Sequence, residues 1–383
     1  MQTQTSEHPR YNAYGVVSII ALLTITITVR IIAIPYTNLD VNGYLEWYGY
    51  IVKHGFASFK NDFSVYTPPY LYLLWLAEHF RNIISPEVAI KLIPLPFDLL
   101  SAFVVYKIAR IQFPKGNIPM LAATGFLCLP TVIANSSLWG QIDSLYTSFL
   151  LLCFYFLVER KIFWAMLSFG VAISIKAQAI FLMPFLGILF LKKQIRWYSF
   201  LLIPLVYLAV GLPAVYAGRS WQSYLTLYFG QLEHFEELAK TAPNLYIFIP
   251  LKYYHPVLEI GLTIFVLVML AWAWINWKTT FPYGKRQLAL TALASVTLVP
   301  FLLPKMHDRY FYPADALSFV TALIIPELWF LPILFQISSG FAYTIFLFGA
   351  SPIFVYIAAV LNTFLVIYIP YKQLQSLKQN NTN

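Results

Sequence analysis

Long apolar runs recur along almost the whole chain, from Gly15 to Pro370. Most have about 17–25 residues, which at a rise of 1.5 Å per residue lets a helix cross a hydrocarbon core of about 30 Å. The pattern predicts helices over residues 15–35, 88–109, 118–135, 143–159, 162–175, 178–191, 197–216, 256–277, 288–304, 314–326, 328–348 and 352–370. The expected fold is an all-α polytopic membrane protein with about 11–12 transmembrane helices in one domain, residues 1–371. A polar tail is expected over residues 372–383.

Two stretches between the predicted helices, residues 36–87 and 217–255, are too long to be simple connections. In the first, Pro68 and Pro69 open an aromatic segment of roughly 12–14 residues, which is too short to span a bilayer and is rich in Tyr and Trp. Such segments are typical of helices that lie in the membrane interface. We therefore expect in-plane helices in this first outer loop. The second loop either closes over a ligand or presents a solvated helix face, and the sequence assigns no role to its residues.

The composition excludes a soluble protein, because only 11% of the residues are charged and 60% are hydrophobic, whereas soluble domains have roughly 25% charged residues. Lys and Arg concentrate in loops at one end of the predicted helices, including residues 107–115, 160–161, 192–196 and 278–286. The positive-inside rule places these loops and the N-terminus in the cytoplasm. The net charge of +9 therefore needs no nucleic-acid partner, since basic loops face an anionic lipid leaflet.

Three further features limit the possibilities. The first apolar run lacks a small-x-small cleavage site, so we interpret it as a retained helix. Cys128 and Cys153 both lie in apolar runs and predict neither a disulfide framework nor a metal site. Asp98, inside the second predicted helix, is the clearest exception to the charge pattern, and the sequence gives it no role.

The segment KMHDRYFYP at residues 305–313 places Lys305, His307, Asp308 and Arg309 between two apolar runs. Ionisable side chains at a membrane boundary are costly unless they face a polar cavity or partners, so they indicate a functional site. Arg offers a fork of donors and Lys a point charge, and both suit a phosphate. The alternative is an interfacial cluster whose long side chains merely reach water at a helix end.

Asp40 follows the first predicted helix by about five residues and lies at the same, non-cytoplasmic end as the 305–313 segment. On a helix, Tyr44 at i+4 and Trp47 at i+7 would share its face, whereas Glu46 at i+6 would not. Asp40 is either a catalytic carboxylate, which we favour, or an ordinary helix N-cap.

Two more polar motifs are expected at this end. In WGQID, Trp139 could stack on a sugar while Gln141 and Asp143 bind hydroxyls. The equal alternative is an N-cap at Asp143 beside an interfacial Trp. Lys176 and Gln178 interrupt an apolar stretch and must face protein. For Lys176 we favour phosphate contact over a buried structural ion pair.

Taken together, these motifs resemble the GT-C glycosyltransferases that use polyprenyl-phosphate sugars. The resemblance rests on a lone aspartate after the first helix (Asp40), the aromatic Y-x-P-P segment at Tyr66–Pro69, WGQID at Trp139–Asp143, SIKAQ at Ser174–Gln178 and the motif at His307–Arg309. It covers nearly the whole chain and is closest to bacterial relatives of the GPI second-mannose transferases. The expected fold is then a GT-C-like bundle.

The resemblance implies a membrane enzyme that moves a monosaccharide, with mannose favoured, from a polyprenyl-phosphate donor to a lipid- or glycan-linked hydroxyl acceptor. Asp40 would deprotonate the acceptor, and Lys176, His307 and Arg309 would hold the lipid-linked phosphate. Direct attack would invert the anomeric configuration. The site would face the periplasm of a bacterial plasma membrane, in contact with membrane lipids.

The chain lacks the paired acidic signature of several GT-C branches, so we expect no metal and no other cofactor. The alternative function is a transporter or flippase for lipid-linked sugars. Such proteins often have internal repeats and polar sites near the bilayer midplane. Here the polar motifs fall at one face, which favours an enzyme.

Overall fold

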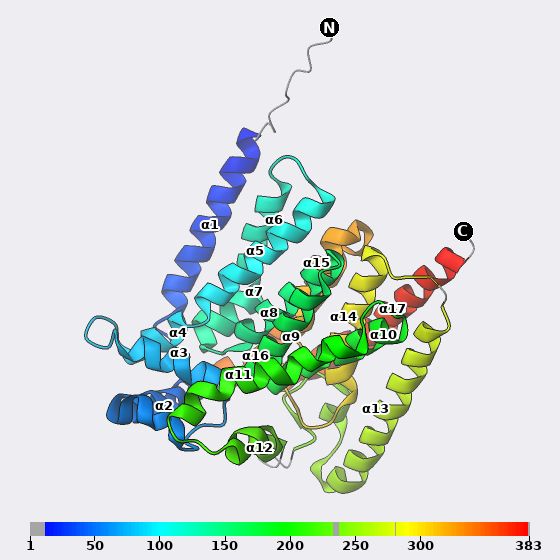
Figure 1. Cartoon of the computed structure of the whole chain (residues 1–383). Coiled ribbons are helices and arrows are strands. Elements are labelled where there is room, and N and C mark those ends of the chain that lie inside the picture. The colour runs from blue at the N-terminus through cyan, green and yellow to red at the C-terminus, as the bar shows by residue number, and fades with distance from the viewer. Residues whose placement is uncertain (1–11, 233–236, 280, 382–383) are drawn as a thin grey trace.

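The computed structural model describes residues 12–232, 237–279 and 281–381, and almost every element in these ranges is helical (Figure 1). In chain order the elements are α1 (Ala13–Ala33), α2 (Leu39–His54), η1 (Gly55–Lys60), α3 (Pro68–Glu78), α4 (Pro86–Leu92), α5 (Leu95–Gln112), α6 (Ile118–Leu127), α7 (Pro130–Ile133), η2 (Ala134–Trp139), α8 (Asp143–Val158), α9 (Ile162–Ile175), η3 (Ala177–Leu182), α10 (Met183–Leu191), η4 (Trp197–Leu201), α11 (Leu202–Tyr216), α12 (Trp221–Leu232), β1 (Ala239–Lys240), η5 (Leu245–Phe248), η6 (Leu251–Tyr253), α13 (Tyr254–Trp277), α14 (Lys285–Leu302), β2 (Met306–His307), α15 (Tyr312–Ile324), η7 (Pro326–Leu328), α16 (Phe330–Phe348) and α17 (Ile353–Asn381).

The central helices pack on one another around one extended hydrophobic core. Helix α8 lies against α5 and α9, α14 lies against α15 and α17, and α16 completes this side by packing on α15 and α17. Apolar side chains line all of these contacts, so burial of apolar surface stabilises the packing of these helices. Helices α2 and α12 lie at the lower end of the molecule in Figure 1, whereas both termini lie at the upper end.

The predicted all-α polytopic membrane fold is confirmed. Within the described residues, six helices are long and apolar enough to cross a membrane, or seven if the bent pair Ile118–Leu127 and Pro130–Trp139 is one span. Four further apolar helices have only 10–17 residues. Each predicted range therefore contains a helix, but fewer segments than the expected eleven or twelve meet the length of a full span, because breaks shorten several of them.

One break lies at a proline, and the others lie next to polar motifs of the sequence. The span over residues 118–139 bends by 49° at Pro130 and ends in the π-helical turn η2. The next break lies at Lys176, between α9 and η3. Irregular backbone is tolerated at membrane depth only where protein or a polar cavity surrounds it. These breaks therefore indicate where a polar interior site lies.

The polar tail expected from residue 372 is wrong as a separate segment, because α17 continues to Asn381. The side chain of Gln373 is fully buried, and its carbonyl oxygen accepts a hydrogen bond of 2.9 Å from the Trp272 indole. Ser376 accepts another, of 3.0 Å, from Gln287. Polar residues extend this helix because they find partners on α13 and α14.

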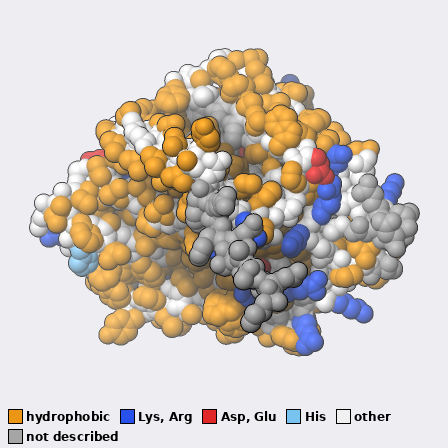
Figure 2. All heavy atoms as spheres, turned by 90° about the horizontal axis from the view of Figure 1, so that it is seen from above, with side chains coloured by type: hydrophobic (Ala, Val, Ile, Leu, Met, Phe, Trp, Pro, Cys, Tyr) orange, Lys and Arg blue, Asp and Glu red, His pale blue; other side chains and the backbone are white. Residues whose placement is uncertain are grey.

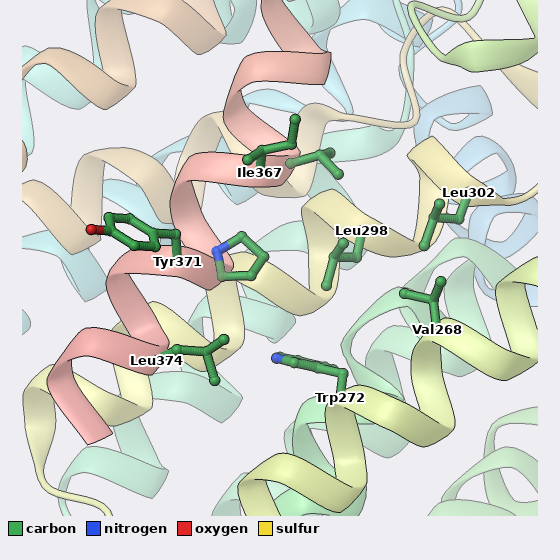
Figure 3. A pocket seen from close by; sticks show the side chains of 9 residues that line it. Val268, Trp272, Leu298, Leu302, Ile367, Tyr371 and Leu374 are labelled. Carbon is green, nitrogen blue, oxygen red and sulfur yellow. The ribbon is translucent and has the colours of Figure 1, made fainter. Parts of the chain in front are cut away.

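Figure 2 shows the end of the molecule that carries both termini. More basic than acidic side chains are visible on this face. Elsewhere, α13, α14 and α17 line an open pocket of about 400 Å³ (Figure 3). Its lining comprises Val268, Trp272, Leu298, Leu302, Val366, Ile367, Pro370, Tyr371 and Leu374. No carboxylate, Lys, Arg or His is among them, so this pocket offers neither a carboxylate base nor a cation for a phosphate.

Candidate active site

Arg309 is the centre of a charged cluster whose members come from distant parts of the sequence. Its Nη1 lies 3.9 Å from Oδ2 of Asp40 on α2 and 3.6 Å from Oδ1 of Asp308. Its Nε lies 3.7 Å from Oδ2 of Asp143 on α8. The Arg309 side chain is only 14% exposed. The tertiary structure thus brings together three of the regions in which the sequence predicted site residues.

Asp40 lies in the first turn of α2, with its side chain 29% exposed. Its Oδ2 accepts a 2.8 Å hydrogen bond from the Trp139 indole N–H and another from the Gln141 amide. The N-cap of α2 is Asn38, whose side chain accepts from the backbone N–H groups of Asp40 and Val41 at 3.1 and 3.2 Å. The N-cap alternative for Asp40 is therefore wrong. Its carboxylate is oriented by two hydrogen bonds while the side chain stays partly exposed.

Trp139 is fully buried, so the expectation that it stacks on a sugar is wrong, as is the interfacial alternative. One side of its ring stacks on Phe346 at 4.8 Å, and the edge of Tyr343 meets it at 5.2 Å. The Arg309 guanidinium lies 5.5 Å from the ring centroid. These neighbours enclose the indole, which leaves its N–H to orient Asp40.

Gly140 turns the chain between Trp139 and Gln141 so that both side chains reach Asp40. Its φ of +77° lies in the left-handed region, which a glycine adopts without strain. The carbonyl oxygen of the Gln141 side chain accepts hydrogen bonds from Tyr44 at 2.9 Å and Tyr66 at 3.3 Å. Tyr44 was expected at the site, whereas Tyr66 was known only as part of an aromatic motif.

Asp143 and Lys176 form an ion pair in the interior. Asp143 is fully buried, Lys176 is 5% exposed, and Asn135 donates a further hydrogen bond of 2.9 Å to Asp143. Asp143 is not an N-cap, because that position belongs to Ile142, which makes no side-chain cap. The buried ion pair, which was the alternative interpretation of Lys176, is therefore present in the structure. Each of the two buried charges would be strongly destabilising without the other. Contact of Lys176 with phosphate stays a prediction.

Residues His307 and Asp308 are held by the second outer loop, whose participation the sequence did not reveal. Strand β1 pairs with β2 in parallel, with Lys240 opposite His307. The Thr241 hydroxyl donates to Asp308 at 3.1 Å. Two-residue strands have no sequence signature, because hydrophobic alternation needs several residues to be recognised.

Burial changes the pKa values of both His307 and Asp308. Burial lowers the pKa of His307 to about 2, and the cations Arg309, Lys240 and Lys176 act in the same direction. The imidazole is therefore neutral at physiological pH, so His307 can meet a phosphate through a hydrogen bond and not through a charge, and its contact with phosphate stays a prediction. Burial raises the pKa of Asp308 to about 6, although the Arg309 charge opposes this.

Gln178 is not joined to Asp40, Asp143 or Arg309 by any hydrogen bond or ion pair within the described ranges. It lies in η3, two residues after Lys176, and its carbonyl oxygen is buried without a hydrogen bond in those ranges. No group of three or more His, Cys, Asp or Glu side chains in the described part of the chain is placed to hold a metal ion.

Two buried cations that the sequence analysis left out support the turn that carries Trp139. Lys91 donates to the carbonyl oxygen of Leu138 at 2.8 Å. Arg30 pairs with Asp98 at 2.8 Å, and this explains the isolated carboxylate of the second predicted helix. A charge in each of two apolar runs was a signal that could have identified the pair, since such charges must find partners.

Comparison with known proteins agrees with this reading of the chain. The family model described as Glycosyltransferase family 87 matches residues 65–304. The match includes Trp139–Asp143 and Lys176, whereas Asp40 and the 305–313 segment lie outside it. No curated protein matches the chain.

Proposed function

The chain belongs to glycosyltransferase family 87, in the GT-C class, and from this premise we propose that it transfers a monosaccharide from a polyprenyl-phosphate donor to a hydroxyl acceptor, with Asp40 as the general base. The observation that carries the proposal is the position of the Asp40 carboxylate. Two donors fix it, one part stays exposed, and the Arg309 guanidinium lies 3.9 Å away. A base and a phosphate-binding cation are thus neighbours.

The reaction needs little more than these two groups. The acceptor O–H gives its proton to Asp40 while its oxygen forms a bond to the anomeric carbon. The bond from that carbon to the phosphate oxygen breaks, and the lipid phosphate leaves with the electron pair. Attack from the side opposite the leaving group inverts the anomeric configuration. General base catalysis typically contributes about 10²–10⁴-fold, and cations aimed at the leaving phosphate stabilise its growing charge.

Arg309 is suited to bind the phosphate because its carboxylate neighbours do not use up its donors. The three carboxylates lie 3.6–3.9 Å from its nitrogens, which is beyond hydrogen-bond distance. Its Nε is buried and makes no hydrogen bond within the described residues. Lys176 is the second cation we assign to the phosphate. His307, being neutral, would contribute a hydrogen bond rather than a charge.

The proposed orientation places the site on the non-cytoplasmic face, which in a bacterium is the periplasm. Helix α2 with Asp40 lies at the lower end in Figure 1, and both termini lie at the upper end, the basic face of Figure 2. Basic surfaces favour the cytoplasmic side. An Asn42→Cys variant should react with an impermeant thiol reagent in intact cells, and labelling only after lysis would contradict this orientation.

Mannose is the sugar we propose first, on the resemblance to mannose-transferring enzymes. A transporter of lipid-linked sugars is disfavoured, because the cluster of Asp40, Asp143 and Arg309 fits a reaction centre and the chain is a glycosyltransferase by family.

The test is transfer of labelled mannose from polyprenyl-phosphate mannose by the purified protein in detergent. Asp40→Asn should lower turnover at least about 10²-fold while donor binding is kept. Glu46→Gln is the matched control, because this exposed carboxylate lies on the same helix away from the cluster. Near-normal turnover in Asp40→Asn would end the assignment of the base.

A further inference from the structure

Helix α2 continues past Asp40 with a strip of half-buried residues along one flank. Gly43 and Trp47 follow Asp40 at i+3 and i+7, so the three lie on one side of the helix. Tyr44, Tyr48 and Ile51 form the adjoining buried side. The strip thus lies at the boundary between the packed face of α2 and its surroundings.

Gly43 leaves open space beside Asp40. A Cβ placed there would meet no atom within 4 Å. At Gly211, by contrast, a Cβ would collide with the Tyr224 ring, so that glycine has a packing reason. Glycine inside a helix is less favourable than alanine, and neither close packing nor a left-handed backbone requires it at position 43. Its effect is a notch one helical turn from the proposed base.

Trp47 forms the far side of this notch, about 10 Å along the helix axis from Asp40 at 1.5 Å per residue. Its ring lies 5.3 Å from Tyr44 and 5.3 Å from Tyr66. Both tyrosines donate to Gln141, which in turn donates to Asp40. The aromatic wall and the base therefore share one hydrogen-bonded framework.

The indole of Trp47 offers both features that a sugar needs. It is half-buried, and its N–H makes no hydrogen bond to any residue that the structure describes. An aromatic face packs on the C–H groups of a sugar ring, while the N–H can reach a hydroxyl. A few placed polar groups beside apolar walls are typical of ligand sites.

We propose that the notch formed by Asp40, Gly43 and Trp47 binds the acceptor and that the acceptor is a saccharide, with its ring on Trp47 and its reacting hydroxyl at Asp40. The inference rests on the proposed function, because it names the acceptor class of the same site. The proposal favours a glycan-linked acceptor over a plain lipid alcohol, because a lipid alcohol has no sugar ring to pack against Trp47.

The test compares octyl hexopyranosides with 1-octanol as acceptors, with polyprenyl-phosphate mannose as the donor. The wild type should transfer to a glycoside and not to octanol. Gly43→Leu fills the notch and Trp47→Ala removes its wall, so each should raise the KM for the glycoside about tenfold. The KM for the donor should stay within about twofold, because Arg309 and Lys176, which we assign to its phosphate, are unchanged in both variants.

Gly49→Leu is the matched control, since Gly49 is on the same helix, is exposed and also has no atom within 4 Å of an added Cβ. It should leave both KM values unchanged. Direct binding of a radiolabelled octyl glycoside without donor gives a second readout, and thermal unfolding checks that each variant is folded.

The outcomes separate the two proposals. If the wild type transfers sugar but prefers octanol, or if Gly43→Leu and Trp47→Ala keep the normal glycoside KM, the acceptor inference alone is overturned. If the wild type moves no sugar from the donor to any acceptor, water included, the proposed function fails and this inference fails with it.

Discussion

Replacement of Arg30 or Asp98 should destabilise the protein severely, although neither residue touches the reacting groups. The guanidinium Nη1 of Arg30 lies 2.8 Å from Asp98 and also donates to Ser136 at 2.8 Å and Ser137 at 3.0 Å. The side chains of the pair are 10% and 2% exposed. Loss of one partner leaves the other charge buried without compensation.

The magnitude follows from burial. Removing one member of a buried ion pair typically costs about 3–5 kcal/mol, whereas replacing both by apolar residues is often nearly neutral. We therefore expect Arg30→Leu and Asp98→Leu each to lose about 3–5 kcal/mol of unfolding free energy. The double variant should recover most of the loss, except for the hydrogen bonds to Ser136 and Ser137, worth about 1 kcal/mol each.

The assay is reversible unfolding in mixed micelles with increasing sodium dodecyl sulfate, which yields the free energy of each variant. The exposed pair Arg286–Glu327, at 2.6 Å with side chains 43% and 56% exposed, is the control. Glu327→Gln should cost less than about 1 kcal/mol. The reasoning is refuted if Arg30→Leu costs no more than this surface change, or if the double variant loses the sum of the two single losses.

Three further predictions concern the site. Arg309→Lys keeps the charge but loses the forked donors, so donor affinity should fall about tenfold in a binding assay, and unchanged affinity would contradict phosphate contact. Burial and the charges of Arg309, Lys240 and Lys176 lower the pKa of His307 from 6.5 to about 2. Below pH 6.5, therefore, His307 gains a proton in the unfolded protein but not in the folded one. The stability of the protein falls as the pH drops for this reason. His307→Asn should therefore flatten the loss of melting temperature between pH 6.5 and 4, and parallel curves would refute this; Asp308, whose raised pKa acts in the opposite direction, is present in both proteins. Transfer should survive EDTA, and loss that Mn²⁺ restores would show that a metal takes part.

The sequence by itself determined the membrane fold, because apolar runs of spanning length leave few alternatives to helices. It also predicted a candidate site at one end of the bundle. In a chain with so few charges, the ionisable residues at Asp40, Asp143, Lys176 and Arg309 had to face one another or a polar cavity. The structure joins all four, since Asp40 and Asp143 lie beside Arg309 and Lys176 pairs with Asp143.

Only the tertiary structure decided which partner each buried group takes. The sequence does not say which carboxylate pairs with Lys176, and it is the packing of α8 against α9 that brings Asp143 to it. The sequence allowed Trp139 to stack on a sugar, but in the structure its ring stacks on Phe346 of α16. Strand β1 meets β2 across 67 residues of sequence, a contact with no local signal. Spacing along a helix is a local property, which sequence reveals, whereas the choice of a buried partner depends on how distant helices pack.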